Sequence, residues 1–465
     1  MATIPTTDCS FGDIVTAYNT TVGSGSQISM NNINLKTSFS GKKIYNPGWP
    51  ITGTTVIPSS SISTSLFYGK TFQKPTPTVT FSSSSAVVDA NAGAQSWNNP
   101  TIMRVLEAPT PKLYALYTGV PAGSASLTVK ISTNLNTSWQ SPAGGSGGAI
   151  IDSGMPGAWA GQYSMATGDA GNVYFAYGKS NGLWLYQQNG SWNYTAPGPH
   201  QLISPANSAR YVSIAIISIP LPPDYFTVED WIYISYQDYN SGNIKFAYYK
   251  KNTSYTPPPT LSATIDSNSN NYANCIALGN DASSGGPLVF IVWLQYNNSS
   301  SLYNVKFKKG TYNNTITNYT WTSSSNVGNA YGSSGATVNL YAKDDNNLYL
   351  SYVNSSQKIV LQKSTDGGSN WTEKVINEAG SSADYACDMH VKDSNIWISY
   401  HYGSQDANLG AVYSYDNGST WYQGASTSSV YDARTNAITV YDNKAYIIGA
   451  AGIGNPLECV TVEIT

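Results

Sequence analysis

The chain has 465 residues, of which 11% are charged, and its 23 Lys and Arg nearly balance its 26 Asp and Glu. This balance excludes the basic field that nucleic-acid binding needs and a basic patch for a membrane surface. Tyr is abundant, with 36 residues, and long Leu/Ala/Glu/Lys stretches are missing, which predicts an all-β protein with almost no helix.

The first twenty residues lack the basic start and apolar core of a secretory signal. The longest apolar run, Tyr211–Leu221, is about half of the ~20 residues that cross a bilayer, so we expect no membrane insertion and synthesis in the cytoplasm. The four cysteines are scattered and form no metal-binding motif, so we expect neither a metal nor a cofactor.

Residues 1–75 do not share the pattern of the rest of the chain. They carry a short repeat of their own, Ile28–Ile33 and Ile62–Phe67, and the second copy runs into Phe67-Tyr68-Gly69-Lys70. These segments resemble short stretches near the start of bacteriophage tail and virion structural proteins. The resemblance implies an N-terminal anchoring segment over 1–75, although two hairpins or one-turn helices with a Ser cap explain the same residues. Phe72–Pro77 reads as a linker.

One strand pattern recurs through residues 76–465. It has the form apolar-aromatic-apolar-small-aromatic, and the intervals between its aromatic residues are 60, 59, 57, 59, 48 and 49 residues. The aligned aromatic residues are Tyr114, Tyr174, Tyr233, Phe290, Tyr349, Trp397 and Tyr446. Most copies follow a second apolar segment and a turn, and two more strands come after them. Four strands per repeat and seven repeats predict a seven-bladed β-propeller, with two stacked β-sandwiches as the alternative.

The last repeat stops after its third strand, near Thr465. A strand from upstream of the first blade could complete it, and Thr78–Phe81 is the best candidate, followed by Val87-Val88. Such pairing would hide an exposed sheet edge.

Two turns fit the pattern Ser-x-Asp-x-Gly-x-x-Trp, 50 residues apart and in register with the strand repeat. A third, Ser132–Trp139, has Asn at the Asp and Gly positions. All three resemble the Asp box, or BNR repeat, of sialidase-like propellers, in which this turn joins the third and fourth strands away from the active centre. Turn chemistry accounts for every residue type, so we assign a structural role to Ser132, Asn134, Trp139, Ser364, Asp366, Gly368, Trp371, Ser414, Asp416, Gly418 and Trp421.

The resemblance also raises the question of catalysis. Sialidases hold the substrate carboxylate with three arginines, and this chain has three in all, Arg104, Arg210 and Arg434. Arg104 lies on the first strand of the first blade, where the family has an Arg-Ile-Pro arginine, but the Pro is missing and no Tyr/Glu pair can be assigned. We therefore expect no catalytic residues, with the three arginines as candidates if the protein is sialidase-like.

An anchoring segment followed by a neutral, Tyr-rich propeller is the layout of a virion attachment protein. We expect residues 1–75 to dock on other virion or tail subunits while the propeller binds a host-surface receptor. Aromatic rings with Asn, Ser and Thr around them suit glycans, and the candidate ligand residues are Trp159, Tyr163, Tyr239 and Tyr402. By analogy with fibres, a homotrimer is expected. The alternatives are a sialidase-like glycoside hydrolase and a purely structural virion component.

Overall fold

The computed structural model divides the chain into two compact units, Met1–Pro77 and Thr78–Thr465. In the first unit, β1 (Lys43–Tyr45) and β2 (Thr54–Val56) form a two-stranded antiparallel sheet. The repeats Ile28–Ile33 and Ile62–Phe67 lie outside the described residues. The structure describes residues 43–45, 54–56, 78–90, 102–106, 111–119, 125–142, 149–155, 163–168, 172–179, 181–188, 200–203, 209–220, 228–250, 261–279, 286–313, 318–331, 336–376, 383–402, 408–425, 436–442, 444–450 and 456–464.

The second unit consists of seven antiparallel sheets, in six of which the strands follow one another in chain order. Blade 1 comprises β5 (Ile102–Leu106), β6 (Lys112–Gly119), β7 (Ala125–Ser132) and β8 (Ala149–Met155); blade 2 comprises β9 (Tyr163–Thr167), β10 (Val173–Lys179), β11 (Gly182–Gln188) and β12 (His200–Ile203). Blade 3 comprises β13 (Ala209–Pro220), β14 (Val228–Asp238), β15 (Ile244–Lys250) and β16 (Leu261–Asp266); blade 4 comprises β17 (Asn271–Leu278), β18 (Val289–Asn297), β19 (Leu302–Asn313), β20 (Asn318–Trp321) and β21 (Ser325–Ala330). Blade 5 comprises β22 (Val338–Ala342), β23 (Leu348–Val353), β24 (Ile359–Ser364) and β25 (Thr372–Ile376); blade 6 comprises β26 (Ala383–Lys392), β27 (Asn395–Tyr402), β28 (Asn408–Ser414) and β29 (Tyr422–Ala425). Blade 7 comprises β30 (Asn436–Tyr441), β31 (Lys444–Ala450) and β32 (Leu457–Ile464), together with β3 (Val79–Phe81) and β4 (Ala86–Asp89).

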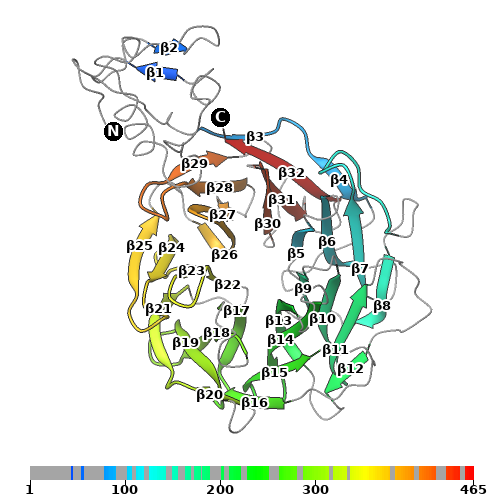
Figure 1. Ribbon diagram of the computed structural model, residues 1–465, viewed down its shortest axis with the longest axis vertical. Helices are drawn as coiled ribbons and strands as arrows, with labels where there is room; N and C mark the ends of the chain where they lie inside the picture. Colours follow the sequence, from blue (N-terminus) through cyan, green and yellow to red (C-terminus); the bar gives the residue numbers. More distant parts are fainter. Residues whose placement is uncertain are drawn as a thin grey trace. The chain divides into compact units, whose positions relative to one another are not determined.

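The seven sheets form a closed ring. The first strand of each blade contacts the first strand of the next, and β30 of blade 7 contacts β5 of blade 1, so the circuit returns to its start. Figure 1 shows these first strands nearest the centre of the ring. The arrangement confirms the predicted seven-bladed β-propeller and replaces the alternative of two stacked sandwiches.

The core lies between the blades. Seven clusters of buried side chains each join two neighbouring blades, one for every blade interface. The second strands are covered on both faces, which is why they read as continuous apolar runs rather than alternating ones. All seven aromatic residues of the repeat pattern are buried within them. These residues therefore pack the blades together, as the sequence predicts.

Blade 7 is completed from upstream of blade 1. Both candidate segments pair with β32: β3 aligns Val79 with Ile464, and β4 aligns Val87 with Glu458. Val79 is buried against blade 6 side chains as well as blade 7. The predicted closure is confirmed, with the two candidates sharing one partner strand.

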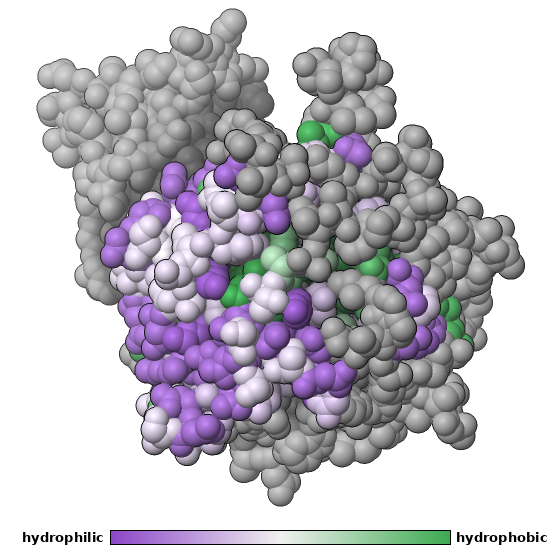
Figure 2. Space-filling view, turned by 90° about the horizontal axis from the view of Figure 1, so that it is seen from below, coloured by the Kyte–Doolittle hydropathy of each residue, from purple (hydrophilic) through white to green (hydrophobic). Residues whose placement is uncertain are grey.

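The described part of the propeller surface that faces the viewer in Figure 2 is mostly polar. Seen from below in Figure 2, hydrophilic and intermediate residues cover most of the coloured area, and hydrophobic residues form only small patches. Among the described residues, no helix has the length and apolar character to cross a membrane.

Candidate functional site

The strands of a blade are antiparallel, so successive turns lie alternately at its two ends. The turns between third and fourth strands lie at one end, and the turns between second and third strands lie at the other, together with the connections between blades. The three Ser turns, Ser132–Trp139, Ser364–Trp371 and Ser414–Trp421, all follow third strands, so we name their side of the ring the Ser-turn face. The opposite side is named the loop face.

The two complete Ser turns are held by the same hydrogen bonds. In the second of them, Ser414 Oγ donates to Asp416 Oδ1 at 2.8 Å and accepts the N–H of Gly418 at 2.9 Å. Asp416 Oδ1 also accepts the N–H of Thr420, and Trp421 Nε1 donates to the carbonyl of Gly418. The turn of blade 5 repeats each of these bonds with Ser364, Asp366, Gly368, Asn370 and Trp371.

The third Ser turn keeps this geometry with different residues. Ser132 Oγ donates to Asn134 Oδ1 and accepts the N–H of Asn136, which takes the place of the glycine with a φ of +79°. Trp139 Nε1 donates to the Asn136 side chain, where the complete copies use a backbone carbonyl. Asn tolerates the left-handed region better than most residues, so the turn survives the exchange.

Each of the three Ser turns also contacts the preceding blade. A Cβ at Gly418 would lie 2.6 Å from Leu361 of blade 5, and one at Gly368 would lie 2.3 Å from Phe307 of blade 4. In the third turn, Asn136 Nδ2 donates to the carbonyl of Cys459 on β32. Every polar group of the pattern is thus engaged within the turn or with a neighbouring blade, which fits a structural role.

The loop face carries a cation stacked on an aromatic ring. Tyr239 follows β14 in the turn between the second and third strands of blade 3, and its side chain is 42% exposed. The guanidinium carbon of Arg210, near the start of β13, lies 3.3 Å from the centre of its ring. Burial lowers the pKa of Arg210 to about 10, so the side chain remains charged at neutral pH. The pair presents an aromatic ring to solvent on a charged support.

Further tyrosines surround this pair. Tyr211 has a φ of +47° and meets Tyr272 of blade 4 edge to face, with ring centres 6.4 Å apart. Tyr272 in turn contacts Tyr303 edge to face at 5.2 Å. An aromatic cluster therefore runs from blade 3 into blade 4 beside Arg210.

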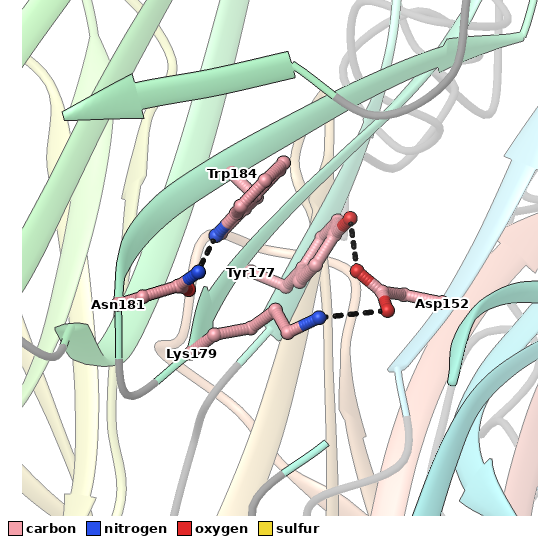
Figure 3. A network of polar contacts seen from close by, with 5 residues as sticks. All are labelled: Asp152, Tyr177, Lys179, Asn181 and Trp184. Carbon is pink, nitrogen blue, oxygen red and sulfur yellow. Dashed lines mark hydrogen bonds and ion pairs between the residues drawn. The ribbon is translucent and has the colours of Figure 1, made fainter. Parts of the chain in front are cut away.

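A polar network joins blades 1 and 2 near the loop face (Figure 3). Asp152 on β8 accepts a bond from the Tyr177 hydroxyl at 2.8 Å and one from Lys179 Nζ at 2.9 Å. The Lys179 ammonium lies 5.5 Å from the centre of the Trp184 ring, and Trp184 Nε1 donates to Asn181 Oδ1 at 3.0 Å. This network was not predicted, because its charged partners come from different blades.

A second set of polar side chains lies on the first strands, around the ring axis. Asp388 accepts the backbone N–H of Met389 and, across to blade 7, that of Ile438, each at 2.9 Å. Burial raises the pKa of Asp388, and the Arg104 guanidinium acts in the opposite direction. Burial, then Arg104 and Lys392, lower the pKa of His390 to about 3. Arg104 therefore acts electrostatically on side chains of blade 6, and its own Nη1 donates to the carbonyl of Met103.

The predicted ligand residues fall in different environments. Tyr239 is exposed on the loop face, whereas Tyr402 is half-buried at the end of β27 and packs on Tyr400. Tyr163 was expected beside a loop, but it opens β9 and is buried, because its ring fills the core between blades 1 and 2. It offers no surface for a sugar. Trp159 lies outside the described residues.

The two arginines that the structure describes make different contacts. Arg104 acts on blade 6, whereas Arg210 is stacked on Tyr239 of its own blade. Arg434 lies outside the described residues. Within the described ranges, no group of three His, Cys, Asp or Glu side chains is placed to hold a metal ion.

No family model and no curated protein matches the sequence. Solved structures resemble the chain in fold. A mutant of the Aleuria aurantia lectin in complex with α-methyl-L-fucoside is 9% identical, with a TM-score of 0.44 over 80% of this chain and 96% of the lectin. An ulvan lyase bound to its saccharide is 11% identical, with a TM-score of 0.46 over 81% and 95%. The Trypanosoma rangeli sialidase is 9% identical, with a TM-score of 0.41 over 83% of this chain and 59% of the enzyme. At these identities the likeness is one of fold alone.

Proposed function

We propose that this protein binds glycans of a host surface through the loop face of its propeller, as an attachment protein of a virion such as a phage tail or fibre. The observation that carries the proposal is Tyr239, the one exposed aromatic side chain among the described residues. Its ring is held by Arg210 at 3.3 Å, so little freedom is lost when a ligand settles on its open face.

The surroundings of Tyr239 suit a sugar. A hexose has an apolar face that stacks on a ring and hydroxyls that need hydrogen-bonding partners. Asn240 follows the tyrosine and is exposed, and its backbone N–H bonds to Asp238 Oδ1 at 3.1 Å, which fixes the turn. The Ser turns, which resemble Asp boxes, use their polar groups on the other face, so the loop face is left for the ligand.

The assignment to a virion rests on the sequence of residues 1–75 and on the two-unit division of the chain. In the proposal, this segment docks on other tail subunits, and the protein forms a homotrimer. Immunogold labelling of purified particles with antibodies against the propeller tests the location. Sedimentation equilibrium of the full chain tests the trimer, and a monomer would contradict it.

Glycan binding is tested on a glycan array with the full chain and two variants of Tyr239. Tyr239→Ala removes the stacking ring and should weaken binding about tenfold, whereas Tyr239→Phe keeps the ring and should bind within about twofold of the parent. Tyr415→Ala is the matched control, because Tyr415 is a half-exposed tyrosine on the Ser-turn face. Equal loss in all three variants would contradict the assignment of the site.

We expect the protein to bind its glycan without hydrolysing it. A chromogenic sialoside separates it from the sialidase-like alternative, which requires that the protein release the chromophore and that Arg104→Ala abolish the release. Such a result would replace the proposed function with hydrolysis.

A further inference from the structure

The first strand of blade 3 carries a strained residue next to the proposed glycan site. Tyr211, in β13, has a φ of +47°, in the left-handed region where a bulky side chain is strained. Of the described non-glycine residues with a positive φ, Tyr211 alone lies within a strand, and the others lie in turns between strands. Turn geometry therefore does not account for the backbone at Tyr211.

The strain belongs to a β-bulge that blade 4 holds in place. The pairing of β13 with β14 shifts register between Arg210 and Ser213, so β13 has one residue more than its partner strand here. Asn274 Nδ2 of blade 4 donates to the Tyr211 carbonyl, and the N–H of Ile276 donates to Ser213 Oγ at 3.2 Å. A bulge re-aims the side chains beside it, and backbone strain of this kind concentrates at ligand sites.

The bulge directs two neighbouring side chains to two different aromatic rings. Arg210 supports the exposed ring of Tyr239, whereas Tyr211 meets Tyr272 of blade 4 edge to face, with ring centres 6.4 Å apart. Burial lowers the pKa of Arg210, and the hydroxyls of Tyr239 and Tyr211 both raise it, which places the two phenols around one guanidinium. Tyr211 and Tyr272 are each partly exposed, so their rings form an aromatic corner beside Tyr239.

The loop that enters blade 4 adds hydrogen-bonding groups to this corner. Its residues 267–269, a Ser, an Asn and a Ser, are exposed, and they come shortly before Tyr272 in the chain. A Cβ at Gly242 would collide with the carbonyl of Ser269, so this loop touches the turn that carries Tyr239. Exposed hydroxyl and amide groups beside aromatic rings suit the hydroxyls of a sugar.

We infer that Tyr211 and Tyr272 form a second sugar subsite next to Tyr239, and that the bulge of β13 positions Tyr211 in it. The inference rests on the proposed glycan binding and specifies its ligand. That ligand is an oligosaccharide with one residue on Tyr239 and a following residue in the corner between blades 3 and 4, rather than a single terminal sugar. A second, linked subsite raises the affinity for a spanning ligand, because its contact becomes intramolecular.

Calorimetric titration of the full chain compares single sugars with short oligomers. The probes are the methyl glycosides of glucose, galactose, mannose, N-acetylglucosamine and galacturonic acid, and oligomers of about two to four residues of each. Within the series that binds, an oligomer should bind about tenfold more tightly than its methyl glycoside. Tyr211→Asn removes the ring but tolerates the left-handed backbone, so it should abolish that gain and leave the methyl glycoside within about twofold of the parent.

Three further variants separate a lost subsite from a damaged fold. Tyr211→Phe keeps the ring and should retain the gain with length. Tyr272→Leu should lose as much of the gain as Tyr211→Asn, and it carries the test if Tyr211→Asn fails to fold. Gln357→Asn is the control, because Gln357 has a similar φ of +55° but lies in a turn of blade 5, and every affinity should stay unchanged.

The outcomes distinguish this inference from the proposed function. If no probe binds, the two fail together. If a probe binds through Tyr239 with an affinity that changes neither with its length nor with substitution of Tyr211 and Tyr272, glycan binding stands and the second subsite is overturned.

Discussion

Replacement of Ser414 by alanine tests how much one Ser turn contributes to the propeller. Ser414 is buried, and its hydroxyl is both the acceptor for the N–H of Gly418 and a donor to Asp416. The Ser414→Ala variant loses hydrogen bonds that contribute about 1 kcal/mol each and leaves a buried N–H without its acceptor, at a cost of about 1–3 kcal/mol. The free energy of unfolding should therefore fall by about 3 kcal/mol.

Urea unfolding followed by tryptophan fluorescence measures this change, with the m-value as a check that the unfolding transition itself is unaltered. Ser419→Ala is the matched control in the same turn: its exposed hydroxyl donates only to the Asp416 carbonyl at 3.0 Å, and the loss should stay within about 0.5 kcal/mol. The equivalent Ser364→Ala variant in blade 5 should lose as much as Ser414→Ala. Equal, small shifts in all three variants would refute a structural role for the buried hydroxyl.

Three further variants probe other parts of the ring. Gly418→Ala should lower the free energy of unfolding by about 2–4 kcal/mol, because a φ of +85° and Leu361 at 2.6 Å both oppose a Cβ; an unchanged urea midpoint would contradict this. His390 has an ordinary pKa of 6.5 that falls to about 3 in the folded chain, so below pH 6.5 the unfolded state takes up a proton that the folded state refuses. The free energy of unfolding should then decrease as the pH is lowered below 6.5, by at most about 1.4 kcal/mol per pH unit. His390→Asn should flatten that slope in urea titrations between pH 6.5 and 4. Val79→Ala should cost about 2 kcal/mol, because it empties a buried position where β3 meets blade 6, and calorimetry showing no change in Tm would contradict the importance of the closing strand.

The seven blades were predictable because every second strand is buried on both faces. That environment requires a run of apolar and aromatic residues, so a run that contains a residue such as Tyr174 or Trp397 indicates the second strand of a blade. The closing strand was predictable for a similar reason, since a last blade that lacks its outer strand must find one. The Ser turns are local, and all of their residues lie within eight positions, so their hydrogen bonds follow from the sequence pattern.

The contacts of the candidate site could be predicted less well from the sequence. The ion pair of Asp152 and Lys179 joins residues of two blades, and a sequence gives no measure of how neighbouring blades face each other. Tyr163 shows the same limit: it stands next to a loop in the chain, but strand pairing with Tyr177 turns it into the core. Tyr239 could be predicted as a surface residue from its polar turn, but its support by Arg210 could not.

The joint between β3 and β32 also sets the order in which the molecule can be finished. The N–H of Thr461 donates to Ser82 Oγ, 379 positions away in the chain. During translation, β3 leaves the ribosome long before its partner exists, and loop-closure entropy must be overcome before that pairing forms. The nascent ring is therefore an open arc with an uncovered strand edge, and this stage is where chaperones and aggregation would compete for the protein.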